Sequence, residues 1–224
     1  MPSLIISRYC ENLSWLIKYN KNFEIIVYNK GDFYAESNFK KIIKLPNVGR
    51  ESHTWLYHIV NNYDNLDDKN IFLQGRIDDL DCMVYKNLNN YLDDLGKYNF
   101  SCSRLGLLGP FHWSENLGIE KDPRYAEKWK TNQIKKSKLG FRKFAKNLFP
   151  NIPYFVATSY GGCFGVTKGA ILSNKRTFYC DLLEILSDHD NPIEGHYMER
   201  LWCYIFTKNK PIFRSFKDVI KTKI

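Results

Sequence analysis

The stretch Phe23-Glu24-Ile25-Ile26-Val27-Tyr28, followed by Asn29-Lys30-Gly31-Asp32, decides the fold class. Its first half is rich in β-branched and aromatic residues and its second half is a turn signal, so it predicts a buried strand that ends abruptly. A shorter apolar run at residues 4–7 predicts another strand, and the apolar residues within 13–17 follow helical spacing between the two. The N-terminal part of the chain therefore predicts a strand–helix–strand unit.

The same alternation continues along the chain. Pro46-Asn47-Val48-Gly49 breaks the chain before residues 50–63, where apolar side chains at helical spacing predict a helix. Residues 70–73 predict a third strand, which stops at Gln74-Gly75. Strands that alternate with helices are typical of a mostly parallel sheet with helices on both faces. We predict a single-domain, Rossmann-like α/β fold over residues 1–224.

The second half of the chain is less regular. Residues 154–158 predict a strand, and the glycine-rich run at 160–166 predicts a strand or a β-bulge. Glycines in this run, Gly162 among them, remove side chains where a substrate or a neighbouring backbone must approach closely. Further helices are expected at 168–172, 177–187 and 199–206.

Composition narrows the class of protein. With 44% hydrophobic and 25% charged residues, the chain is a folded globule and not a disordered tail. Its six cysteines form no CxxC pair and no Cys/His cluster, so we expect free thiols in a reducing compartment and no structural zinc. No segment approaches the ~20 apolar residues that span a bilayer. We expect a cytoplasmic protein, in the host cytoplasm if it is viral, with any membrane association peripheral.

The chain is basic, with 33 Lys and Arg residues against 24 Asp and Glu residues and a net charge of +9. Such a charge attracts polyanions, whether nucleic acid, anionic membrane or the diphosphate of a nucleotide sugar. Residues 121–146 are strongly basic with interleaved aromatic residues. A solvated surface face explains this segment better than a dedicated nucleic-acid site, because nucleic-acid recognition motifs are missing. Nucleic acid is therefore not the expected partner.

Polar residues directly after the strands are the candidates for ligand binding. Parallel α/β sheets bind ligands at the carboxyl ends of their strands, where loops converge and helix N-termini offer N–H groups to anions. Arg50 also begins a predicted helix and offers a bidentate fork to phosphate. Any one of these polar residues is also common in an ordinary surface loop. Their joint placement after successive strands favours a role in ligand binding. The other residues at these positions are Arg8, Tyr9, Asn29, Lys30, Asp32 and Gln74.

Two further groups of residues are candidates for metal binding and catalysis. Asp78 and Asp79 follow the third strand, and they suit either Mg²⁺ or Mn²⁺ binding or the N-capping of a helix. Glu194 and Glu199 are candidate general bases, and His196 could ligate a metal or bind phosphate. Each of these three residues also has a purely structural explanation. Glu194 could cap the helix, Glu199 could form an ion pair on the helix, and His196 could be an ordinary surface histidine.

Four motifs of the chain carry a family resemblance: Asn47-Val48-Gly49-Arg50-Glu51, Phe72-Leu73-Gln74-Gly75, Gly161-Gly162-Cys163-Phe164-Gly165-Val166 and Glu199-Arg200-Leu201-Trp202. They resemble motifs of GT-A-type glycosyltransferase-like proteins from fungi, bacteria and large DNA viruses, including a glycosyltransferase-like domain of a chlorella virus. The resemblance covers most of the chain and implies a GT-A fold, a nucleotide-sugar donor, with uridine as the favoured base, and a divalent cation, Mn²⁺ or Mg²⁺. Where the family has Asp-x-Asp, this chain has Gln74-Gly75-Arg76, which leaves the metal requirement open.

The predicted function is therefore that of a glycosyltransferase. It would move a sugar from a nucleoside-diphosphate donor to a glycan or another hydroxyl acceptor, in glycan biosynthesis. Residues from about 1 to 110 would form the nucleotide-binding half, and residues from about 111 to 224 the acceptor side. The alternatives are a basic nucleic-acid-binding module and a catalytically inactive nucleotide-sugar-binding protein.

Overall fold

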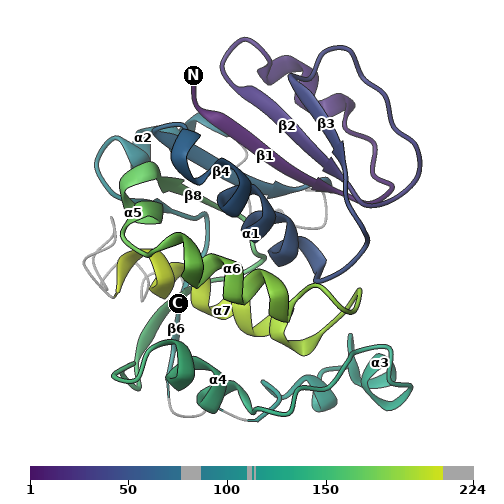
Figure 1. The fold of residues 1–224 in the computed structure, drawn as a ribbon, viewed down its shortest axis with the longest axis vertical. Coiled ribbons are helices and arrows are strands. Elements are labelled where there is room, and N and C mark those ends of the chain that lie inside the picture. The colour runs from purple at the N-terminus through teal and green to yellow at the C-terminus, as the bar shows by residue number, and fades with distance from the viewer. Residues whose placement is uncertain (77–86, 110–112, 114, 209–224) are drawn as a thin grey trace, which may run out of the picture.

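The chain folds around a six-stranded, mostly parallel sheet in its computed structural model, which describes residues 1–76, 87–109, 113 and 115–208 (Figure 1). The strand order is β3-β2-β1-β4-β8-β5, in which the first four strands are parallel and β8 is antiparallel to both of its neighbours. The bounds are β1 Ser3–Arg8, β2 Glu24–Asn29, β3 Lys41–Lys44, β4 Lys69–Gln74, β5 Phe100–Ser101 and β8 Phe164–Thr167. A second, two-stranded antiparallel sheet pairs β6 (Leu105–Leu108) with β7 (Val156–Ser159).

Both faces of the large sheet are covered. Leu4, Ile5 and Ile6 of the central strand β1 have no exposed surface, which explains why this strand is a continuous apolar run instead of an alternating one. One face packs against α1 (Arg50–Asn62), α6 (Arg176–Ile185) and α7 (Ile193–Thr207). The other face packs against the 3₁₀ helix η1 (Ser14–Tyr19) and α2 (Asn89–Leu95). The predicted α/β fold with helices on both faces is confirmed.

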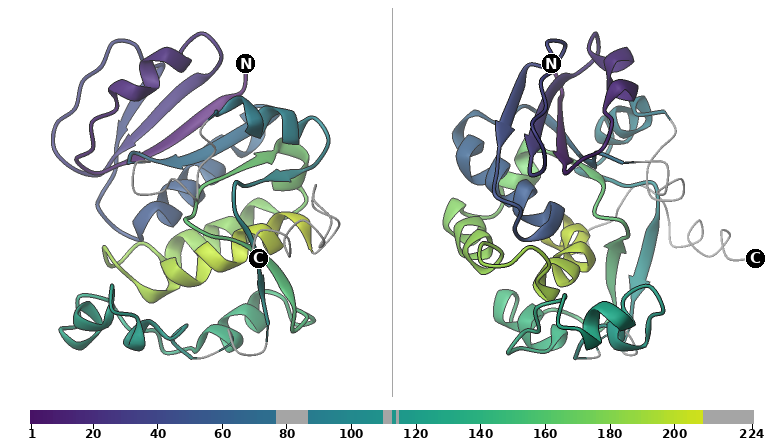
Figure 2. Two further views of the ribbon diagram at one scale, coloured as in Figure 1. Left: turned by 180° about the vertical axis from the view of Figure 1, so that it is seen from behind. Right: turned by 90° about the vertical axis from the view of Figure 1, so that its right-hand side faces the viewer.

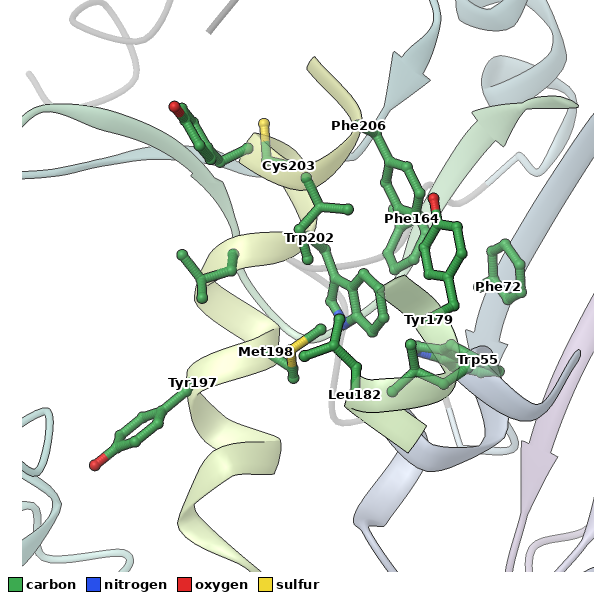
Figure 3. Packing of buried hydrophobic residues seen from close by; sticks show 14 of the residues in the cluster. Trp55, Phe72, Phe164, Tyr179, Leu182, Tyr197, Met198, Trp202, Cys203 and Phe206 are labelled. Atoms are coloured by element: carbon green, nitrogen blue, oxygen red, sulfur yellow. The ribbon is translucent and has the colours of Figure 1, made fainter. Parts of the chain in front are cut away.

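The larger core is built from aromatic side chains of the sheet, α1 and α7 (Figure 3). Phe164 of β8 lies at the centre, 5.1 Å from Phe72 of β4 and 5.5 Å from Trp202 of α7, measured between ring centroids. Trp202 in turn stacks on Phe206 at an interplanar angle of 9°. Full burial of one such side chain stabilises the fold by about 1.5–3 kcal/mol. This contact fixes α7 against the sheet.

A third layer covers the far side of α7. It contains η5 (Ile119–Lys121), α3 (Ala126–Lys130) and α4 (Phe141–Leu148), and it lies at the opposite end of the molecule from β2 and β3 (Figure 2). Phe141 and Phe144 of α4 pack on Tyr197 of α7, at centroid distances of 5.1 and 5.4 Å. Because α7 has neighbours on both sides, it is apolar around most of its circumference.

The remaining elements refine the sequence-based boundaries. The sequence did not predict the edge strand β3, and the helix expected near residues 13–17 is the 3₁₀ helix η1. The glycine-rich run divides into a turn and β8, and the last helix begins at Ile193 instead of residue 199. The other short helices are η2 (Tyr63–Asn65) and α5 (Lys168–Leu172). No helix in the described parts of the chain is long and apolar enough to cross a membrane.

Candidate functional site

The order of the strands places a switch point between β1 and β4. From β1 the chain moves outward to β2 and β3, and it then returns to place β4 on the other side of β1. In open α/β sheets, ligands bind at the carboxyl ends of the strands beside such a point. Arg8 ends β1, Asn29 ends β2 and Gln74 ends β4, so the predicted residues do lie along one edge of the sheet.

Arg8 fixes the loops after β1 and β2. Its Nη1 donates to Asn29 Oδ1 at 2.8 Å and to the Tyr9 carbonyl at 3.1 Å, and its Nε donates to the Glu11 carbonyl at 2.9 Å. The side chain is buried, and the guanidinium lies 4.2 Å from the centre of the Tyr34 ring. Most of its donor capacity is thus used within the protein, which gives Arg8 a positioning role. Tyr9 and Asp32 lie exposed on the surface of these loops.

Lys30 holds the loop that leads into α1. Its Nζ donates to the carbonyl of Val48 at 2.5 Å and to the carbonyl of Arg50. Burial lowers the pKa of Lys30 to about 7, because the charged ammonium has lost most of its water. Two of its three N–H groups donate to backbone carbonyls. The Lys30 side chain therefore links the end of β2 to the start of α1.

Arg50 begins α1 in a strained backbone conformation. Gly49 has φ +60° and Arg50 has φ +53°, and only the first of these residues is a glycine. A non-glycine residue in the left-handed region costs of order 1–3 kcal/mol and is found where the surroundings impose it. The Arg50 Nη1 donates to His196 Nε2 at 2.9 Å, and its Nε lies 3.6 Å from Glu51 Oε2.

His196 of α7 is a neutral acceptor in this contact. Its burial, together with the nearby Arg50 and Arg200, lowers the pKa of His196 to about 2. Because arginine has only donors, Nε2 must carry the lone pair and Nδ1 the proton. The buried Nδ1 finds no hydrogen-bond partner among the described residues.

Glu51 contributes a carboxylate to the same place. Its side chain is 9% exposed, and its Oε1 is buried and accepts no hydrogen bond from the described residues. A Cβ atom added to Gly162 would lie 3.0 Å from this Oε1 atom. Glu51 therefore lies directly against the turn between β7 and β8, where Gly161 and Gly162 both have positive φ angles.

Glu199 lies on the other side of this turn. Its Oε1 accepts from the Gly161 N–H at 3.0 Å, and its Oε2 pairs with Arg200 Nη1 at 2.8 Å. The turn is held further by Gln74 Nε2, which donates to the Gly161 carbonyl at 2.9 Å, and by Trp55, which donates to the Gly162 carbonyl. The charged cluster of this site consists of Arg50, Glu51, His196, Glu199 and Arg200.

The charged cluster is balanced and reaches the surface. Two guanidinium groups face two carboxylates around a neutral imidazole, which is how a protein offsets the cost of burying charge. The side chains of Arg50 and Arg200 remain 23% and 19% exposed, so part of each faces solvent. The arginines of the charged cluster can bind phosphate, and its carboxylates can accept hydrogen bonds from hydroxyl groups. The glycine turn has no side chains, so a ligand could approach its backbone closely.

Some predicted site residues do not join the charged cluster. Glu194 is in the first turn of α7, but its side chain makes no hydrogen bond to a described residue and does not cap the helix. The metal role predicted for His196 does not fit, because its Nε2 lone pair accepts from Arg50 and its Nδ1 carries the proton. No group of three or more His, Cys, Asp or Glu residues suited to a metal was found in the described ranges. Asp78 and Asp79 lie outside those ranges.

Sequence reasoning missed Glu51. The signal was its position two residues after Gly49, in the first turn of a helix that follows a strand end, where a carboxylate suits the helix dipole. Its pairing with the Gly161–Gly162 turn has no local signature, because the partners come from distant segments.

Gly162→Ala is expected to destabilise the protein by about 1–3 kcal/mol. The new methyl group would strain a backbone with φ +64° and would meet Glu51 Oε1 at 3.0 Å. Gly169→Ala is the matched control: it lies in α5 with open space around the added carbon, and it should stabilise by up to about 1 kcal/mol. Urea unfolding measures both, and equal stability of the two variants would contradict this account of the turn.

Comparison with known proteins gives one match. A family model described as "Protein of unknown function (DUF3431)" matches residues 4–219, nearly the whole chain. No curated protein and no solved structure matches.

Proposed function

The chain belongs to the DUF3431 family, and we propose that it is a glycosyltransferase of the GT-A type. It would move a sugar from a nucleoside-diphosphate donor, with uridine as the favoured base, to a hydroxyl group of a glycan or another acceptor. One observation carries this proposal. Two largely buried carboxylates and two arginines meet around a glycine turn, at the edge of the parallel sheet where the strands end.

Arg50 and Arg200 are the proposed diphosphate ligands. Both side chains are partly exposed, and a planar fork of N–H groups matches two phosphate oxygens. Arg8, Asn29 and Lys30 support the loops that hold the nucleotide. Tyr9 and Asp32, exposed at the ends of β1 and β2, are the proposed contacts to the nucleoside.

Glu51 is the proposed general base in place of Glu194 or Glu199. Its Oε1 is buried and accepts no hydrogen bond from the described residues, and its Oε2 faces Arg50 Nε at 3.6 Å, whereas both oxygens of Glu199 have partners. In the proposed step the carboxylate takes the proton of the acceptor hydroxyl, and the oxygen forms a bond to the anomeric carbon. The bond from that carbon to the diphosphate breaks, and the nucleoside diphosphate leaves with the electron pair.

The described residues do not by themselves form a site for Mn²⁺ or Mg²⁺. These cations prefer several oxygen ligands, whereas the Glu51 carboxylate lies beside the cation of Arg50. We therefore assign the neutralisation of the diphosphate to Arg50 and Arg200. Adding Mn²⁺ in the experiment below tests whether Asp78 and Asp79 supply further ligands.

A thermal-unfolding panel tests the proposal. Nucleoside diphosphates and nucleotide sugars are added with and without Mn²⁺, since a ligand at 100 times its Kd stabilises the native state by about 2.7 kcal/mol. We expect stabilisation by uridine compounds that is lost in Arg200→Ala and kept in Arg176→Ala, an exposed arginine of α6. Stabilisation without release of nucleoside diphosphate to any acceptor would indicate the inactive binding protein. No stabilisation by any nucleotide would overturn the proposal.

A further inference from the structure

The net charge of the protein is concentrated in one segment of the third layer. Residues 121–146 contain ten Lys and Arg residues and two Asp and Glu residues, a net charge of +8 out of +9 for the whole chain. All of these cations except Arg142 are exposed. The rest of the chain is nearly neutral, so the protein is electrically polarised and not uniformly basic.

The third layer presents these cations away from the core. Phe141 and Phe144 of α4 face α7, whereas Lys143 and Lys146 of the same helix are exposed on the opposite side. Lys128 and Lys130 of α3 are exposed as well. The exposed cations without an ion pair to a described residue are Lys121, Lys128, Lys130, Lys136, Lys138, Lys143 and Lys146.

Exposed aromatic rings lie beside the basic helix α4. Tyr154 and Phe155 keep 60% and 57% of their surface exposed, although each is large and apolar. The guanidinium of Arg142 lies 4.3 Å from the ring centre of Trp113 and 4.5 Å from that of Tyr154, and its Nη1 donates to the Pro153 carbonyl at 3.1 Å. The Tyr154 ring is thus held against Arg142 of α4, the helix that carries Lys143 and Lys146. The basic face is defined as Lys128, Lys130, Lys143, Lys146, Tyr154 and Phe155.

From this combination we infer that the basic face docks on the surface of an anionic lipid bilayer. Clusters of four to eight cations attract acidic phospholipid headgroups, and aromatic side chains settle at the boundary between headgroups and acyl chains. Eight of the ten cations in the segment are lysines, which act as point charges on mobile stems. Nucleic-acid sites instead favour arginine forks, and here Arg142 is occupied by aromatic rings and backbone carbonyls.

This inference is independent of the donor chemistry at the charged cluster. Lys143 and Lys146 belong to α4, and Tyr154 and Phe155 directly precede β7, whereas Arg50 and Glu51 begin α1. Lys128 of α3 is the member of the basic face that lies near enough to the charged cluster to help lower the pKa of His196. Docking would hold the enzyme next to acceptors that are embedded in a membrane or carried on it, and it needs no membrane-spanning helix.

Vesicle flotation tests the docking surface. Phosphatidylserine-containing vesicles should bind the protein, and vesicles of phosphatidylcholine alone should not. Each lysine near an anionic surface raises affinity about fivefold, so Lys143→Glu/Lys146→Glu should lower partitioning by at least about 25-fold. The matched control, Lys18→Glu/Lys21→Glu, changes the net charge equally at exposed lysines near η1 and should keep most of the binding. Thermal unfolding confirms that both variants are folded.

A third variant separates the membrane from other polyanions. Phe155→Ser should weaken the vesicle binding that remains at high salt, where charge attraction is screened over about 3 Å at 1 M. Equal losses in the two lysine variants would overturn the inference, because net charge and not the basic face would then decide binding. Absence of binding to the phosphatidylserine vesicles, or tighter binding to a single-stranded oligonucleotide that displaces them, would overturn it as well.

Discussion

Glu51→Gln is expected to lower the rate of sugar transfer by about 10²–10⁴-fold, the range that a positioned general base contributes. Glutamine has nearly the same shape and still offers an oxygen toward Arg50, but it cannot take a proton from an acceptor hydroxyl. Nucleotide binding should change little, so the loss should appear in kcat and not in donor affinity. Stability should fall, because the substitution removes the negative charge that faces Arg50, and thermal unfolding checks that the variant is folded at the assay temperature. The measurement is release of nucleoside diphosphate with a hydroxyl acceptor present.

The matched control for this variant is Glu194→Gln. Glu194 is also partly buried, but it makes no hydrogen bond to a described residue and is not a member of the charged cluster. Its replacement should leave turnover within about twofold, because it removes no catalytic group. Full activity of Glu51→Gln would remove Glu51 from the mechanism, and a large loss in Glu194→Gln would return the role of base to that residue.

Arg50→Ala is expected to destabilise the protein by about 3–5 kcal/mol, the cost of breaking a buried ion pair by removing one partner. The truncation leaves Glu51 buried without its nearest cation and leaves His196 Nε2 without its donor. Urea unfolding should show the loss as a lower midpoint. Arg176→Ala is the control, because this exposed arginine donates a single hydrogen bond to the Val60 carbonyl and should cost about 1 kcal/mol.

A double variant distinguishes charge burial from lost packing. Arg50→Ala/Glu51→Ala removes both members of the pair, so no carboxylate stays buried at that position. We expect it to be more stable than Arg50→Ala alone, since replacing both partners of a buried pair costs less than removing one. If the double variant is less stable by the sum of the two single changes, then packing of the Arg50 stem against Gly195 dominates instead.

The strands were predictable where they are continuous apolar runs. The runs predicted at residues 4–7 and 23–28 correspond to β1 and β2. They are recognisable because these strands are buried on both faces, which leaves few polar residues in them. The edge strand β3, Lys41-Ile42-Ile43-Lys44, has two apolar residues and exposed lysines at both ends, so nothing in its pattern distinguishes it from a loop. Its place is decided by pairing with β2.

The glycine-rich run shows where local pattern was insufficient. A strand and a turn can share the same residues, and the sequence did not show that Gly161 and Gly162 take positive φ angles. Those angles are fixed by hydrogen bonds from Gln74 and Trp55, which belong to β4 and α1. The turn is therefore a product of the assembled sheet and helix.

The sequence by itself determined the α/β layering and the row of polar residues at the strand ends, because periodicity and parallel topology are local consequences of residue type. Only the tertiary structure decided which polar groups of the site are already engaged in hydrogen bonds within the protein. Arg8 and Lys30 spend their donors on backbone carbonyls, whereas Glu51 keeps a buried oxygen without a hydrogen bond from the described residues. Hydrogen-bond partners of a buried group come from remote segments, and their positions exist only once those segments have packed together.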